Sequence, residues 1–393
     1  MKILFPYMAR WFAVNWTRYH SLLTALGEMG HEVHVLQPPP LKSAETNYQE
    51  IKPTDQENLF LHDVKINSLL WNFSFPFDKL FKKALFSHCS YKSAKELIAT
   101  HGIDVLLLYN IPQYFFSNLK GVVQVFDYAD DYIDMLAKEL GRVSNRITLD
   151  IADYVLQTMM KRATITTTVA YELAKAVDGD VVVLPNGVNH KAFEQMFALP
   201  GGTIQSKDKP IVGFVGAFEY FIDFDSILEA AEMLPDVHFL LVGTGRDWEI
   251  VSGKAKAKQL ENIQFTGGVP HAQVFAYIKA MDICLNIFKP IPVSHRACPI
   301  KLFEYMSQKK PVISTRLDEL KNIDSGYLYY ADSGRELIQA IRSILDDWPT
   351  ARKKAQVGWQ VTMDSYTWGR IAENFVELLR SAIVDKQKRL KEG

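Results

Sequence analysis

The sequence predicts an α/β protein with two open parallel sheets, and three observations support this class. Short apolar strands alternate with helical segments, the alternation is interrupted once, and it then begins again. At the start of the chain, strand 2–5, helix 17–29 and strand 31–36 follow one another within about 35 residues, the spacing of a strand–helix–strand unit. Such units build parallel sheets with helices on both faces.

The first half of the chain continues this pattern. Leu22, Leu23 and Leu26 share one face of the first predicted helix, and Gly30 follows as a stop signal. Further strands are predicted at 105–108, 122–126, 163–169 and 181–184, with helices at 90–101 and 145–160.

Residues 198–210 interrupt the alternation. They contain two prolines, two glycines and few apolar side chains, which is typical of a linker. The pattern then resumes and predicts a second sheet. Its strands are expected at 211–215, 238–242, 263–266, 283–287, 312–315 and 327–330, and its helices at 225–233, 274–281, 300–306, 334–345 and 368–379.

Length and composition exclude several classes of protein. The 393 residues correspond to about 2.6 domains of ordinary size. Lysine and arginine total 44 against 45 aspartates and glutamates, which argues against a general nucleic-acid binder. Three scattered cysteines are too few for a disulfide framework or a zinc cluster.

The sequence also predicts where the protein resides. No apolar run reaches the roughly 18 residues that a membrane-spanning helix needs. Pro6, Arg10 and Arg18 interrupt the apolar start that a signal peptide would require. We therefore expect a cytoplasmic protein.

Glycines follow two strands of the predicted second sheet. Strand 211–215 ends at Gly216, and strand 238–242 is followed by Gly243 and Gly245. Glycine lets the backbone approach a ligand closely, and exposed amide groups favour anions such as phosphates. The alternative is that these glycines form plain turns.

The segment 299–306 carries the most informative pair of charges. Pro299 suits the first turn of a helix, and Lys301 and Glu304 are three residues apart, so they share a helix face. A lysine can bind a diphosphate as a point charge, and a carboxylate can accept hydrogen bonds from ribose hydroxyls. The alternative is a solvated Lys–Glu pair.

The second half of the chain resembles a known family. Pro-x-Lys-Leu-Phe-Glu-Tyr-Met at 299–306, followed by Lys-Pro-Val-Ile-Ser-Thr at 310–315, resembles the C-terminal signature of family-4-like (group 1) GT-B glycosyltransferases. Residues 183–189 look like the Pro-Asn-Gly-Val turn of that family, and 262–267 look like one of its strands. The resemblance covers most of residues 181–320 and is only topological before them.

The resemblance implies a GT-B fold, in which two Rossmann-like domains face each other across a cleft. It implies an acceptor-binding domain at 1–195, a domain at 209–370 that binds the nucleotide sugar, and a C-terminal helix at 371–393 that returns to the first domain. The implied partners are a nucleotide-sugar donor, expected to be a UDP-sugar, and a polysaccharide, glycan or lipid-linked acceptor, with no metal and no further cofactor.

The resemblance also implies roles for donor-site residues. Glu304 matches the glutamate that holds the donor ribose, and Lys301 matches the position near the diphosphate. Gly216 is expected under the phosphates, together with the glycines at 243 and 245, and Val269 is expected beside the nucleobase.

One departure from the family pattern affects the donor sugar. The family's first signature glutamate lies eight positions before the second, and here Arg296 stands in its place. Arg296, with His295 beside it, can pair with the carboxylate of a uronate donor. Two alternatives stay open: Arg296 replaces the diphosphate cations that this sequence lacks after Gly216, or it is simply exposed. The stereochemistry of transfer is left open.

Three carboxylates follow strand 122–126 and are candidates for acceptor-side catalysis. Ligands of parallel sheets bind at the carboxyl ends of the strands, and this strand is followed by Asp127, Asp130 and Asp131. Neighbouring negative charges raise the pKa of a carboxyl group, which suits a general base. A divalent metal site is a second interpretation. Capping of the following helix is a third.

Aromatic and basic side chains gather in two segments of the first half. After the first strand these are Arg10, Trp11, Trp16 and Arg18. The second segment has alternating aromatics, which predict an extended stretch, and then a short basic amphipathic helix. Such residues suit an acceptor or a membrane interface, and the alternative is core packing with a solvated lysine edge. The second segment contains Trp71, Phe73, Phe75, Phe77, Lys79, Phe81, Lys82, Lys83 and Phe86.

Two other functions share the predicted fold. A non-hydrolysing UDP-sugar epimerase would need no acceptor. A non-catalytic module would bind the nucleotide sugar without transferring it.

Overall fold

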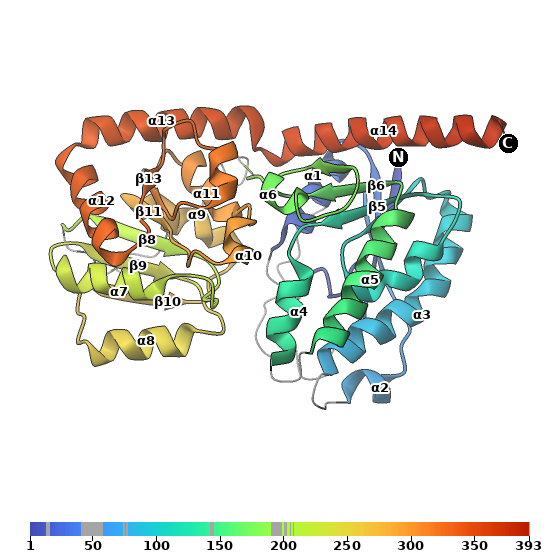
Figure 1. The fold of residues 1–393 in the computed structure, drawn as a ribbon, viewed down its shortest axis with the longest axis horizontal. Helices are drawn as coiled ribbons and strands as arrows, with labels where there is room; N and C mark the ends of the chain where they lie inside the picture. Colours follow the sequence, from blue (N-terminus) through green and yellow to red (C-terminus); the bar gives the residue numbers. More distant parts are fainter. Residues whose placement is uncertain are drawn as a thin grey trace. The chain divides into compact units, whose positions relative to one another are not determined.

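The computed structural model describes residues 1–12, 16–40, 58–73, 75, 78–141, 145–189, 199, 203–204, 206 and 208–392. The chain divides into two compact units (Figure 1). The first contains Met1–Leu184 with Ile371–Gly393, and the second contains Pro185–Arg370. The division falls at Leu184, ahead of the expected linker at 198–210, of which residues 198, 200–202, 205 and 207 lie outside the described residues.

The first unit is built on a parallel sheet of seven strands. The strand order is β3-β2-β1-β4-β5-β6-β7, and every neighbouring pair is parallel. Strand β3 lies at one edge, where it pairs with β2 alone. The strands are β1 (Lys2–Pro6), β2 (Glu32–Gln37), β3 (Leu59–Asp63), β4 (Val105–Leu108), β5 (Val123–Tyr128), β6 (Ile165–Thr168) and β7 (Val181–Val183).

Helices cover this sheet. The predicted apolar face of the first helix is buried, and Gly30 ends the turn after it with φ +83°. Helices α3 and α5 both pack on the 3₁₀ helix η1. The helices are α1 (Arg18–Glu28), α2 (Ser68–Asn72), α3 (Asp78–His101), η1 (Ile111–Asn118), α4 (Tyr132–Leu140), α5 (Arg146–Arg162) and α6 (Tyr171–Ala174). The part of helix α14 (Trp368–Glu392) that follows Arg370 also belongs to this unit.

The second unit is built on a parallel sheet of six strands in the order β10-β9-β8-β11-β12-β13. Strand β8 lies inside the sheet, and the order reverses beside it, where β9 and β11 are its two neighbours. Ligands of open parallel sheets bind at such a reversal. The strands are β8 (Ile211–Val215), β9 (His238–Val242), β10 (Ile263–Gly267), β11 (Ile283–Asn286), β12 (Val312–Ser314) and β13 (Tyr329–Tyr330).

The helices of the second unit cover its sheet. Helix α12 packs against α7, and α13 packs against α11 (Figure 1). The helices are α7 (Phe224–Met233), α8 (Trp248–Ala257), α9 (His271–Ala280), α10 (Pro292–His295), α11 (Ile300–Ser307), η4 (Asp318–Asn322), α12 (Gly334–Asp346) and α13 (Trp348–Ser365).

The predicted α/β class with two parallel sheets is confirmed, and several local predictions are corrected. Strand β3 and helix α13 were not predicted, because β3 is half-exposed and α13 lacks a continuous apolar stripe. Trp71 lies in helix α2 rather than in an extended stretch. The expected short basic helix is the start of the 24-residue helix α3. Phe77 and the side chain of Lys79 lie outside the described residues.

Within the described residues, no helix combines the length and the apolar character needed to cross a membrane.

Candidate functional site

Two glycine loops meet at the carboxyl ends of β8 and β9. Gly216 and Gly243 have φ of +147° and +126°, a region that other residues rarely adopt. A Cβ on Gly243 would lie 2.1 Å from the carbonyl oxygen of Gly216, and one on Gly245 would lie 2.5 Å from the nitrogen of Phe218. Gly243 and Gly245 are therefore required for backbone-to-backbone packing, and they are more than plain turns.

Lys301 reaches this edge from the first turn of α11. Its Nζ lies 4.2 Å from the centre of the Phe214 ring and 5.0 Å from that of Phe288. A Cβ on Gly216 would lie 3.1 Å from the same Nζ. The ammonium group therefore sits at the carboxyl end of β8, held over two aromatic faces by cation–π attraction.

Glu304 lies one turn after Lys301 and is electrostatically coupled to it. Desolvation by the surrounding protein lowers the pKa of Lys301, and the Glu304 carboxylate partly offsets this. Desolvation likewise raises the pKa of Glu304, and Lys301 opposes that shift. Both groups are pushed toward their neutral forms, and an anion at this edge would favour the charged lysine.

Two further contacts fix α11 in place. The amide of Val215 donates to the Tyr305 hydroxyl at 2.8 Å, which ties α11 to β8. The side-chain amide of Asn186 donates to the carbonyl of Cys298 at 2.7 Å. The Pro-Asn-Gly-Val turn therefore holds the loop that leads into α11, a link that sequence spacing alone does not show.

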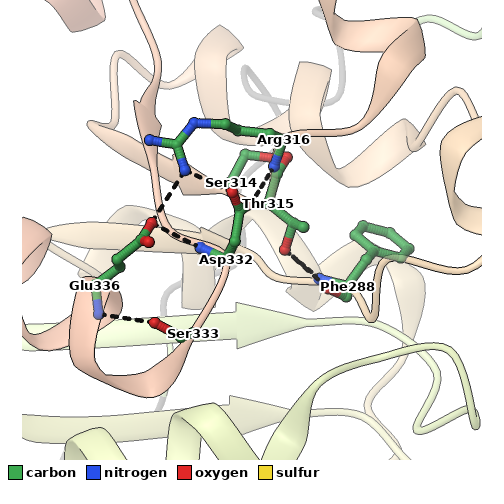
Figure 2. Close-up of polar contacts among 7 residues, drawn as sticks. All are labelled: Phe288, Ser314, Thr315, Arg316, Asp332, Ser333 and Glu336. Atoms are coloured by element: carbon green, nitrogen blue, oxygen red, sulfur yellow. Dashed lines mark hydrogen bonds and ion pairs between the residues drawn. The ribbon is translucent and has the colours of Figure 1, made fainter.

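A buried polar network at the ends of β11 and β12 was missed by the sequence analysis. The Asn286 side chain donates to Ser314 Oγ at 2.9 Å. The Thr315 hydroxyl accepts from the Phe288 amide and donates to the Phe288 carbonyl, each at 2.9 Å (Figure 2). Because Phe288 lies beneath Lys301, this network positions one wall of the lysine site. Its only sequence signal is the pair of polar residues that ends an apolar strand.

A cluster of charged side chains lies at the neighbouring carboxyl ends of β12 and β13. Arg316 donates through Nη1 to Asp332 and to Glu336, and its backbone amide donates to Asp332 at 2.8 Å (Figure 2). Ser333 caps α12 in the same loop. The cluster joins the loops after β12 and β13.

The remaining predicted donor residues lie in loops of the same unit. Arg296 ends the short helix α10, between β11 and α11. His295 Nδ1 lies 3.0 Å from an oxygen of Asp318, which connects the loops after β11 and β12. Val269 lies between β10 and α9 and is half-buried.

Asp127, a predicted catalytic residue of the first unit, is engaged in a buried ion pair. Its oxygens accept from Arg18 Nε at 3.0 Å and Nη2 at 3.2 Å, and from Thr167 Oγ1 at 2.7 Å. Only 1% of Asp127 is exposed. A carboxylate that is buried under three donors is poorly placed to take a proton from an acceptor, so the prediction for Asp127 is corrected to a structural role. Arg18 also donates to the Leu184 carbonyl.

The two other carboxylates differ from Asp127. Asp131 accepts from the Asp134 amide and caps α4, as the capping interpretation predicted. Asp130 is exposed. Desolvation raises its pKa to about 6, Arg18 opposes the shift, and the charges of Asp127 and Asp131 add to it. Of the three, Asp130 alone is exposed, and its role as a general base stays a prediction. The described residues hold no group of three or more side chains suited to a metal ion.

Three residues predicted for the acceptor or membrane are buried, which corrects that prediction. Trp11 is 1% exposed and packs on Tyr7 and His20. Trp71 is 5% exposed and donates to the Pro39 carbonyl. Arg18 is in the ion pair with Asp127. The core-packing alternative holds for these side chains, because their apolar area is already removed from water.

The other predicted acceptor-side residues are less buried. Arg10 donates to the Pro38 carbonyl and to Asp63, and Trp16 donates to Ser21. Lys82 and Lys83 are half-buried on α3. Large apolar side chains near them are exposed: Leu69, Leu70, Phe73 and Phe81.

Comparison with known proteins finds a family match within the second unit. Residues 209–347 match the family model of glycosyl transferases group 1. A curated relative, the putative teichuronic acid biosynthesis glycosyltransferase TuaH of Bacillus subtilis, is 31% identical over 150 residues. That alignment covers 38% of this chain and 38% of the relative, so well under half of either protein is compared.

Solved structures extend the likeness of the fold to the whole chain. Sucrose-phosphate synthase from Thermosynechococcus elongatus superposes with a TM-score of 0.76 at 16% identity, covering 98% of this chain and 99% of that one. Anabaena Alr3699/HepE in complex with UDP-glucose superposes with a TM-score of 0.69 at 14% identity, covering 97% and 100%. Residues 209–347 therefore match the family model of glycosyl transferases group 1, and the chain as a whole has the fold of the GT-B glycosyltransferases.

Proposed function

We propose that this chain is a glycosyltransferase that moves a sugar from a UDP-sugar donor to a glycan or lipid-linked acceptor. The observation that carries the proposal is the position of Lys301, whose ammonium lies against Gly216 at the carboxyl end of β8. This is the strand where the sheet order reverses. The group 1 family match over 209–347 and the UDP-glucose complex of a structural neighbour support the same ligand class.

The chemistry follows from the charges at this edge. A diphosphate placed over Gly216 would meet the Lys301 ammonium, which would stabilise the negative charge that develops as UDP leaves. The Glu304 carboxylate, one helical turn away, would accept hydrogen bonds from the ribose hydroxyls. On the acceptor side, Asp130 would remove the proton of the attacking hydroxyl. No step requires a metal, because Lys301 supplies the positive charge.

The binding step is tested by titrating UDP into the full chain and measuring its affinity calorimetrically. We expect binding by the wild type and a large loss in Lys301→Ala. Lys309→Ala is a matched control, because Lys309 also lies over an aromatic ring, that of Trp359, at the other end of α11. Equal UDP affinity in all three proteins would contradict the proposal.

A uronate is the donor sugar that we propose. Arg296 ends α10 where the family pattern has a glutamate, and His295 beside it is held by Asp318. A guanidinium binds a carboxylate through two parallel hydrogen bonds. The name of the TuaH relative, which refers to teichuronic acid, points to the same class of sugar.

A panel of UDP-glucose, UDP-N-acetylglucosamine and UDP-glucuronate, assayed with wild type and Arg296→Ala, tests the donor sugar. We expect a loss confined to the uronate donor. An equal loss for all three would assign Arg296 to the diphosphate instead, and no loss would leave it outside the donor site.

For the acceptor side, we propose peripheral contact with a membrane that carries a lipid-linked acceptor. Four large apolar side chains are exposed in the segment of the chain that also contains Lys82 and Lys83: Leu69 at 81%, Phe73 at 63%, Leu70 at 50% and Phe81 at 41%. Exposed apolar groups next to lysines suit an anionic bilayer surface. We expect co-sedimentation with anionic liposomes at low salt, weakened in Leu69→Ser/Phe73→Ser. Lack of sedimentation would remove the membrane from the proposal.

The two other functions of this fold have distinct signatures. An epimerase would convert the UDP-sugar into an isomer without any acceptor, and a binding module would bind UDP without turnover. Product analysis with and without acceptor separates both from a transferase. We favour transfer because of the exposed carboxylate at Asp130.

A further inference from the structure

Three histidines from separate elements cluster at the β3 edge of the first sheet. His34 lies in β2, His62 lies in β3, and His101 ends α3. The ring centre of His34 lies 5.2 Å from that of His62 and 5.0 Å from that of His101. His34 is buried, with 2% of its surface exposed, and stacks on Phe60.

The contact between two of these rings depends on their protonation. His34 Nδ1 lies 3.0 Å from His62 Nε2, which is the distance of a hydrogen bond. One nitrogen must donate and the other must accept, so the pair needs at least one neutral ring at that contact. When both rings are imidazolium ions, both nitrogens carry hydrogens, and the bond is replaced by repulsion.

The charged groups around the cluster do not supply a strong countercharge. Among the described residues, the acid that faces His34 is Glu32, whose Oε2 lies 3.6 Å from His34 Nε2. Glu32 is also paired with Lys2 of β1 at 3.0 Å. On the other sides His34 faces His62 and His101, which repel a positive charge. In the described part of the chain, the buried Nε2 of His34 has no hydrogen-bond partner.

The pKa values agree in direction with this geometry. Burial lowers the pKa of His34, and the neighbouring His62 and His101 lower it further, while Glu32 opposes the shift. Burial and His101 lower the pKa of His62. Because both are lowered below the unfolded value near 6.5, the stability that they contribute is present above that pH. It is lost as pH falls through the folded-state pKa values.

The histidines lie at strand β3, whose neighbour in the sheet is β2. Among the described residues β3 is an edge strand, and its pairing with β2 runs from Val33–Leu59 to Gln37–Asp63. Its carboxyl end carries Asp63, which accepts from Gln37 at 2.7 Å and from Arg10 at 3.1 Å.

A chain of contacts continues from β3 to the loop after β1. The same Gln37 side chain accepts from the Trp11 amide at 2.8 Å. If β3 separated from β2, Asp63 would lose its hydrogen bonds with Gln37 and Arg10. Residues 8–12 would then lose the contacts that hold their loop.

We infer that His34, His62 and His101 form a proton-operated latch that holds edge strand β3 and, through Asp63, the loop of Arg10 and Trp11. At neutral pH the latch is closed by the His34–His62 hydrogen bond. On acidification the rings become cationic, the bond is lost, and β3 separates from β2. The inference is independent of the donor chemistry, because every residue in it belongs to the first unit.

Hydrogen exchange on the full chain tests the latch. Protection factors, corrected for the intrinsic exchange rate, are measured at pH 7.5 and 5.5 for peptides that cover residues 59–63, 8–12 and 211–215. We expect wild-type protection at 59–63 and 8–12 to fall by up to about tenfold for each histidine, because pH 5.5 lies one unit below the unfolded-state pKa near 6.5. Strand β8, at 211–215, serves as the internal reference, because it contains no titratable side chain.

His62→Gln keeps a hydrogen-bonding group at the position of Nε2 but does not titrate, so the fall should disappear. His88→Gln is the matched control, because His88 is an exposed histidine of α3 outside the cluster, and this variant should behave as wild type. An equal fall in wild type and His62→Gln, or no fall in wild type, overturns the inference.

If His62→Gln fails to fold, His101→Gln replaces it, because His101 is exposed and its substitution leaves the core intact. A smaller fall than in wild type supports the latch, and an equal fall overturns it.

Discussion

The Nζ atom of Lys301 lies 4.2 Å from the centre of the Phe214 ring, directly against Gly216. A ring face partly compensates a lysine that has left water, but it forms no hydrogen bond with the ammonium. Among the described residues no hydrogen-bond partner of this ammonium is found, which agrees with the proposal that a phosphate ligand binds it.

Replacement of Lys301 by alanine should weaken UDP binding roughly 10- to 100-fold, or about 1.4–2.8 kcal/mol. The physical reason is the loss of the one lysine ammonium at the carboxyl end of β8 among the described residues. Calorimetric titration measures the change, with Lys309→Ala as the control named above. The lysine would be uninvolved in binding if the affinity changed less than twofold.

UDP binding should be accompanied by proton uptake at Lys301. Desolvation lowers the pKa of this group in the free protein, and a bound diphosphate raises it again, so affinity should fall as pH rises. Glu304 is coupled to Lys301 and can exchange a proton of its own, so the test uses Glu304→Gln.

Titrations of Glu304→Gln in buffers of different ionisation enthalpy report the protons exchanged. We expect net uptake, and we expect it to vanish in Lys301→Arg/Glu304→Gln, where the arginine stays charged. If proton uptake persisted in the double variant, its source would be a group other than Lys301.

Substitution of Asp127 should affect mainly stability, and substitution of Asp130 should affect mainly catalysis. Asp127→Asn leaves the buried Arg18 charge unpaired, which should destabilise the first unit by about 3–5 kcal/mol. Asp130→Asn should change stability by less than about 0.5 kcal/mol, as expected for an exposed site, and lower turnover about 10²- to 10⁴-fold. Denaturant unfolding and transfer assays measure the two effects, and the reverse assignment would restore Asp127 as the base.

The pH dependence of the transfer rate should report the ionisation of Asp130. Because the pKa of Asp130 is raised to about 6, the base is protonated below this pH, and turnover should rise with pH through that region. The profile is measured at saturating donor between pH 5 and 8. A flat profile would leave the proton transfer to another group.

Gly243→Ala should destabilise the second unit by about 1–3 kcal/mol, since φ is +126° and the new Cβ would overlap the Gly216 carbonyl. Gly253→Ala is the control. It lies inside helix α8 with nothing within 4 Å, and should stabilise by about 0.5–1 kcal/mol. Denaturant unfolding compares both with wild type, and equal effects would exclude backbone packing as the reason for Gly243.

The sequence by itself determined the α/β class, the two parallel sheets and the pairing of Lys301 with Glu304 on one helix face. These follow from local periodicity, since a spacing of three residues places two side chains together in any helix. The glycines after β8 and β9 were likewise found from their position in the chain.

Only the tertiary structure decided which of three neighbouring carboxylates is paired, which caps a helix and which is exposed. It also decided that Trp11 and Trp71 are buried, and it brought His34, His62 and His101 together from elements 28 or more residues apart. The reason is that desolvation and ion pairing depend on what packs against a side chain. Those neighbours come from distant parts of the chain, so local pattern cannot show them.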